Sequence, residues 1–199
     1  MALRAFFNSV ISGTAPFRTY VLVGFSVMAL TAVMLFAMGR EPICKCGEVW
    51  LWSGDIVSSN NSQHLLDPYS FTHVEHGFGF YALLKFAAGG MPLPLRALFA
   101  IGLESGWEVL ENTDLVINKY REDTISLGYF GDSIVNSLSD ILMNVIGFVL
   151  AARLRARSTV FIFLAIESFL LFWIRDNLIL NIVMLIYPLS AIKAWQLGG

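Results

Sequence analysis

The sequence carries little charge. Only 14% of its 199 residues are Asp, Glu, Lys or Arg, whereas 56% are hydrophobic, and a soluble domain carries roughly 25% charged residues. This balance indicates an integral membrane protein. The net charge of −2 leaves no basic excess of the kind that attracts nucleic acid, so nucleic acid is not an expected partner.

Cysteine and catalytic motifs are scarce as well. The two cysteines, Cys44 and Cys46, are separated by one residue and cannot join distant parts of a fold. We interpret them as two thiols in a loop, with a redox or metal-binding pair as the alternative. The sequence also lacks a G-x-S-x-G elbow, a Walker loop, a G-x-G-x-x-G turn and an S-x-x-K box. Nucleotide hydrolysis and serine-type acyl transfer therefore have no supporting motif.

Long apolar runs predict an all-α, polytopic transmembrane bundle of about six helices in a single domain over residues 1–199. The first run is too long for the apolar part of a cleaved signal peptide, so it is expected to remain as a helix. Gly89-Gly90 with Pro92 and Pro94 predicts a tight turn between the second and third helices. The expected spans are 20–38, 70–88, 94–112, 132–152, 158–174 and 178–195.

The distribution of Lys and Arg predicts the orientation. With these spans, eight of the 13 basic residues fall on one side and five on the other, and Arg153, Arg155 and Arg157 form the strongest cluster. The positive-inside rule then predicts a multi-pass protein of the cell inner membrane with both termini in the cytoplasm. Residues 40–70 and 113–131 would face outward, together with all three histidines.

Two acidic stripes lie on expected helices. Glu104, Glu108 and Glu111 recur at i, i+4 and i+7, which aligns three carboxyls on one helical face. An ionisable side chain at mid-bilayer costs roughly 2.5–3.5 kcal/mol, so it needs a partner, a cavity or water and marks a candidate functional site. The second stripe repeats a polar residue at every fourth position: Asp132, Asn136, Asp140 and Asn144.

The first stripe also has a structural interpretation. If the outer end of the helix emerges into water, Glu111 and in part Glu108 need no other explanation. Glu104 lies deeper and would need either a neutral carboxyl or a pairing with Arg121 or Arg175. A site role for Glu104 or Glu108 is the alternative.

The second stripe and the histidines are open to more than one interpretation. Asp140 and Asn144 can hold membrane helices together at roughly 1 kcal/mol per hydrogen bond, or they can form part of a functional site. His73 and His76 stand at i, i+3 and can share a helix face as metal ligands, as proton carriers or as structural caps. No cofactor is assigned, and metal binding is left open. The candidate catalytic residues are His73, His76, Glu104, Glu108, Asp140 and Asn144.

Three segments resemble those of a known family: SQHLLDPYSFTHVEHGFGFY, GLESGWEVLENTD and GYFGDSIVNSLSDILMNVIG. They are similar to a family of small, uncharacterised proteobacterial inner-membrane proteins of unknown function, across nearly the whole chain. More distantly, His76 with Tyr81, Glu104 and the run Asp140-x-x-x-Asn144-x-x-Gly147 resemble VanZ-like membrane proteins. That resemblance implies a role at the cell envelope. Thr72-His73 stands where the VanZ-like pattern has an Asp-Lys pair.

These features predict an envelope-facing enzyme or binding protein for a lipid or lipid-linked substrate, with the lipid bilayer as its other partner. Asp140 and Glu104 or Glu108 would supply acid–base or metal-binding carboxyls, and His73 or His76 would handle protons. At least one of these histidines should then lie within reach of Glu104, Glu108 or Asp140. A proton-coupled transporter or channel and a non-catalytic envelope scaffold are the alternatives. A transporter should have a polar lining that continues to the cytoplasmic side.

Overall fold

The chain is all-helical, as the sequence predicts. The structure is a computed structural model that describes residues 2–198, and no β-strand occurs within them. The helices are α1 (Ala2–Ser12), α2 (Phe17–Ala37), α3 (Ser70–Ala87), α4 (Leu93–Glu111), α5 (Asp114–Asp123), α6 (Ile134–Arg153), α7 (Ala156–Ile174), α8 (Leu178–Ile186) and α9 (Ser190–Gln196).

Five long helices, α2, α3, α4, α6 and α7, match the expected ones within three residues at each end. Local signals explain several of their boundaries. Pro92 precedes α4, where the missing N–H of a proline costs no helical hydrogen bond. The side chain of Ser133 accepts the N–H of Asn136 and so caps the start of α6.

The expected sixth helix over 178–195 is wrong. Residues 178–186 form α8, residues 190–196 form α9, and Pro188 lies between them. Proline has no N–H and clashes with the preceding turn, which breaks a helix at this point. The polar connection 113–131 also contains a helix that the sequence analysis did not anticipate, α5, capped by Thr113.

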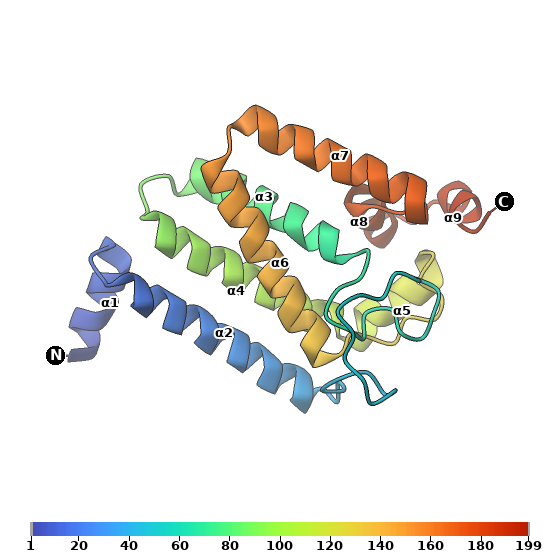
Figure 1. Cartoon of the computed structure of the whole chain (residues 1–199), viewed down its shortest axis with the longest axis horizontal. Coiled ribbons are helices and arrows are strands. Elements are labelled where there is room, and N and C mark those ends of the chain that lie inside the picture. Colours follow the sequence, from blue (N-terminus) through green and yellow to red (C-terminus); the bar gives the residue numbers. More distant parts are fainter. Residues whose placement is uncertain (1, 199) are drawn as a thin grey trace.

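Helices α3 and α6 pack against each other along their length, with α4 and then α2 on one side and α7 on the other (Figure 1). Two glycines permit this close approach. A Cβ on Gly77 would overlap the backbone of Asn144 and Phe148, and a Cβ on Gly147 would overlap the backbone of Val74. Small residues at such crossings allow helix backbones to meet in membrane proteins. The close contact sets how the side chains of α3 and α6 face each other.

The chain gathers its loops at one end of the bundle, which we call the loop end. There α2, α4 and α7 finish, α3 and α6 begin, and the short helices α5, α8 and α9 pack (Figure 1). The opposite end holds α1 and the two turns around Gly89 and Arg155. The N-terminus and the C-terminus therefore lie at different ends of the molecule.

The outer faces of the bundle are apolar, whereas its interior at the loop end is polar. Phe25 and Phe36 on α2 and Phe161 and Phe172 on α7 are all more than half exposed. By length and composition, α2, α6 and α7 are each able to cross a membrane. Helices α3 and α4 are 18 and 19 residues long, but they carry the buried histidines and carboxyls. This arrangement fits a lipid environment outside and a polar centre within.

Candidate functional site

The start of α3 is fixed by Asp67. Its Oδ1 accepts the backbone N–H of Tyr69 at 2.7 Å and of Ser70 at 3.2 Å, and its Oδ2 accepts the N–H of Ser62. Burial raises the pKa of the Asp67 carboxyl, and the hydrogen bond from the Tyr69 N–H is the largest effect that opposes it. The side chain of Ser70 then donates to Oδ1 of Asp140 on α6 at 2.9 Å. The beginning of α3 is thereby tied to the middle of α6.

Both histidines of α3 converge on one carboxyl of α4. His73 Nδ1 lies 2.5 Å from Glu104 Oε1, and His76 Nδ1 lies 3.0 Å from the same oxygen. An ionised carboxylate only accepts hydrogen bonds, so each Nδ1 carries the donated hydrogen. Asn144 on α6 donates to the other oxygen, Oε2, at 3.1 Å. Glu104 is fully buried and joins three helices through these contacts.

One turn along α4, Glu108 is also fully buried, yet neither of its oxygens accepts a hydrogen bond in the described structure. Its Oε1 lies 3.5 Å from His73 Nδ1. On the other side of the same imidazole, His73 Nε2 lies 3.9 Å from Asp140 Oδ2. His73 is therefore at the centre of three carboxyls: Glu104, Glu108 and Asp140.

The polar cluster continues toward the loop end through Asp132. Asn112 donates to Asp132 Oδ2 at 2.8 Å, and Tyr129 donates to Oδ1 at 2.9 Å. Burial raises the pKa of Asp132 to about 6, against the opposing effect of these two hydrogen bonds. Glu111 completes this part of the cluster, since one of its oxygens lies within 4.8 Å of oxygens of Glu108 and Asp132.

A cavity of about 300 Å³ opens on the cluster. Its polar wall includes His73, His76 and Asp140. Apolar side chains also line the cavity, and most of them belong to α8. The apolar lining residues are Phe80, Trp107, Leu178, Ile182 and Leu185.

The structure brings together all six residues that the sequence predicts for the site. The expectation that a histidine lies within reach of Glu104 or Asp140 is confirmed, and both histidines reach Glu104. Of the two alternatives for Glu104, the pairing with Arg121 or Arg175 does not occur, since its partners are His73, His76 and Asn144. Both arginines lie at the loop end, where Arg121 donates to the Tyr129 carbonyl and Arg175 to the Trp195 carbonyl.

Residues outside the two helical stripes also build the site, and the sequence did not predict them. Ser70 was not singled out, and Asp67 was noted only for its place beside the histidines, although an Asp just before a helix is a recognisable capping signal. Tyr129 joins the cluster from a loop, and nothing in the helical periodicity indicates it. Glu167, a buried carboxyl on α7, has a structural role. In the structure it accepts the N–H groups of Leu178 and Ile179 and so caps α8.

Three groups of side chains in this cluster have the composition of a metal site, with one ligand atom from each residue within 4.8 Å of the others. They are His73, His76 and Glu104; His73, Glu108 and Asp140; and Glu108, Glu111 and Asp132.

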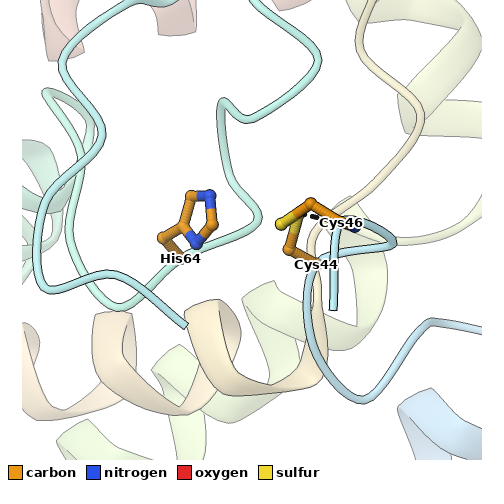
Figure 2. Close-up of side chains that lie close together, drawn as sticks. All are labelled: Cys44, Cys46 and His64. Atoms are coloured by element: carbon orange, nitrogen blue, oxygen red, sulfur yellow. Dashed lines mark hydrogen bonds between the residues drawn. A yellow bond between two sulfur atoms is a disulfide. The ribbon is translucent and has the colours of Figure 1, made fainter. Parts of the chain in front are cut away.

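A separate cluster lies in the loop over residues 38–69. Cys44 and Cys46 form a disulfide, so they are not the two free thiols that the sequence analysis favoured. His64 faces them from another part of the same loop (Figure 2). Its ring stacks on Trp50, and its Nδ1 accepts the Trp50 N–H at 3.2 Å. Burial lowers the pKa of His64, which keeps the imidazole neutral.

The chain belongs to a family described as a protein of unknown function, DUF2585. The family model matches residues 35–198. The chain is also similar to a UPF0314 protein of Sphingopyxis alaskensis, at 49% identity over 92% of this chain and 97% of that protein. A UPF0314 protein of Sinorhizobium fredii is 51% identical over 86% of this chain and 87% of its own length. No solved structure matches the chain.

These relatives confirm an uncharacterised family of proteobacterial proteins, and they assign no activity to it. The more distant resemblance to VanZ-like membrane proteins stays a prediction.

Proposed function

We propose that this protein is a multi-pass inner-membrane enzyme that acts on the head group of a lipid or lipid-linked substrate. The proposal rests on one observation: a single cavity is lined both by histidine and carboxyl side chains and by apolar side chains. An amphiphilic substrate is complementary to both kinds of lining, because its head group can contact the polar side chains and its chain the apolar ones.

Two residues of the polar wall are placed to act on a bound head group. His76 keeps its Nδ1 hydrogen on Glu104, which leaves Nε2 to take or give a proton. Asp140 lines the same cavity and is held by Ser70 through only one of its oxygens. Glu104 holds His76 in place, and Asn144 in turn holds Glu104. His73 and Glu108 are the further ionisable groups next to this pair. The arrangement suits general acid–base chemistry on a polar head group.

The proposed membrane placement has five spans: α2, α3, α4, α6 and α7. Helix α8 has nine residues, about 14 Å at 1.5 Å per residue, and is too short for a hydrocarbon core of about 30 Å. Five crossings put the two termini on opposite sides, which replaces the earlier expectation that both are cytoplasmic. The cluster of Arg153, Arg155 and Arg157 assigns the opposite end to the cytoplasm and the loop end to the outside.

The disulfide supports this orientation, because disulfides persist in oxidising compartments outside the cytoplasm. Reporter fusions test it directly. A reporter inserted near Asn61 and one at the C-terminus should both report the periplasm, and an N-terminal reporter should report the cytoplasm. A cytoplasmic C-terminus would contradict the five-span placement.

The interior of the bundle favours an enzyme over a proton-coupled transporter. The buried residues of α3, α4 and α6 are polar as far from the loop end as Glu75, Glu104 and Asn144. Beyond them, the described buried side chains of these helices are apolar, among them Phe78 and Phe148. A relay across the membrane needs polar groups along its whole length, whereas in this half of the described bundle the buried residues of the three helices are apolar and Arg96 contributes buried polar atoms from a partly buried side chain.

The test compares envelope lipids from a deletion strain that carries wild-type protein, Asp140→Asn or Glu75→Gln. Glu75 is equally buried, on α3, but it lies beside Glu167 outside the cavity lining. An enzyme predicts that one lipid species accumulates in the deletion strain and with Asp140→Asn, and returns to normal with the other two. Identical lipid profiles in all four strains would contradict the proposal.

A further inference from the structure

The carboxyl of Glu108 lacks the hydrogen bonds that a buried charge requires, and the basic group beside it is His73, whose Nδ1 lies 3.5 Å from Oε1. The Glu108 side chain has 0% exposure, and neither oxygen accepts a hydrogen bond. Burying a carboxylate without hydrogen bonds or a counter-charge is strongly unfavourable. The ion pairs of Lys and Arg in the described chain are Lys45 with Glu41 and Lys119 with Asp123, so no such pair neutralises the cluster. Glu108 therefore points to a cation or a proton as its partner.

The imidazole of His73 is arranged as a ligand for that cation. In the neutral ring whose Nδ1 hydrogen goes to Glu104 Oε1, 2.5 Å away, the lone pair is on Nε2. A histidine that binds a metal commonly donates its other ring N–H to a carboxylate, which fixes the tautomer and the ring orientation. Glu104 has this supporting position, and Nε2 points toward Asp140.

Asp140 presents a free oxygen to the same point. Its Oδ1 accepts from Ser70 at 2.9 Å, whereas Oδ2 lies 3.9 Å from His73 Nε2. That separation is too long for a hydrogen bond, but two ligands of one ion, each about 2.0–2.2 Å from it, can be this far apart. One ligand atom each of His73, Glu108 and Asp140 lie within 4.8 Å of one another.

We propose that His73, Asp140 and Glu108 bind one divalent transition-metal ion. One imidazole and two carboxylates suit Zn²⁺, Mn²⁺ or Fe²⁺ better than Ca²⁺ or Mg²⁺, which prefer all-oxygen sites. The inference deepens the proposed function and rests on it in one respect: the ion would lie at the polar wall where the head group is proposed to bind. The ligand set itself stands on the contacts of the three side chains.

The test measures metal content by mass spectrometry in protein purified without chelators. Wild-type protein should hold about one transition-metal ion per chain, and Glu108→Gln and Asp140→Asn should each reduce it at least tenfold. Glu75→Gln, a substitution of an equally buried carboxyl outside every candidate ligand group, should retain the wild-type amount. Asp132→Asn should also retain it, because Asp132 belongs to the neighbouring group rather than to this one.

A measurement on wild-type protein covers the case in which a variant fails to fold. Protein stripped with EDTA should unfold at a lower temperature and recover when Zn²⁺ or Mn²⁺ is added. Wild-type protein that binds neither ion, or Glu108→Gln that keeps the wild-type content, would overturn the proposal. Loss of the ion in Asp132→Asn alone would overturn the ligand assignment.

The readout separates this proposal from the proposed function. Bound metal with unchanged envelope lipids would contradict the enzyme and leave the metal site standing. Changed envelope lipids without bound metal would contradict the metal site and leave the enzyme proposal standing.

Discussion

Helices α3, α4 and α6 each have two halves of opposite chemistry. Toward the loop end they bury His73, Glu108 and Asp140, whereas toward the opposite end they bury apolar side chains such as Phe78 and Phe148. In the apolar half, Phe148 packs edge-on against Tyr81, and backbones meet at Gly77 and Gly147. The apolar half therefore holds the helices together without polar groups.

The polar half contains more charge than helix association needs. Hydrogen bonds between membrane helices contribute only about 1 kcal/mol each, and a buried carboxyl such as Glu108 makes none. A fold that already has a close-packed half can hold such groups rigidly in the other half. In our proposal, the apolar half provides the scaffold and the polar half the chemistry.

The largest effect is expected from Asp140→Asn, which tests the polar half. The amide keeps an oxygen for the Ser70 hydrogen bond, so expression and the thermal midpoint should stay near wild type. Activity should fall by about 100-fold or more, as when an acid–base group is lost. Phe148→Leu, in the apolar half, is the comparison and should lower the thermal midpoint while folded protein remains active. Full complementation by Asp140→Asn at normal expression would contradict the claim that the polar half carries the activity.

Gly147→Ala tests the scaffold. The added Cβ overlaps the Val74 backbone, and overpacking of this kind costs about 1–3 kcal/mol, more than the roughly 1 kcal/mol that alanine gains in a helix. We expect a lower thermal midpoint in detergent and a weaker α3–α6 contact. Gly79→Ala is the matched control on α3, since a Cβ there meets nothing within 4 Å. Equal midpoints for the two variants would show that the close approach does not matter.

The smallest effect is expected from replacing both cysteines with serine. The disulfide spans a sequence separation of 2, and a loop of about three residues gains only about 1.5 kcal/mol in the chain-entropy model. The double variant should therefore fold, keep its activity and lose a few degrees of thermal stability. Loss of activity with an intact fold would extend the functional region beyond the cavity into the loop over residues 38–69.

The periodicity of the sequence predicts the five long helices and the six candidate residues, because burial on one helical face leaves a regular pattern. It does not show that Glu104 binds two histidines rather than an arginine, since that depends on how α3 and α4 are rotated. Helix α8 was not separated from α9 in the sequence, although Pro188 lies between them. The apolar lining of the cavity comes largely from α8, which ends before Pro188. The cavity could therefore not be predicted from the sequence.

The most direct test of the account is an experimental structure of the protein purified with its native lipids. We predict non-protein density in the cavity, with its polar end within hydrogen-bond distance of His76 or Asp140 and its apolar part against Ile182 and Leu185 of α8. A well-ordered cavity without a ligand, with lipid bound only on the outer faces of α2 and α7, would contradict the claim that the polar half is a substrate site.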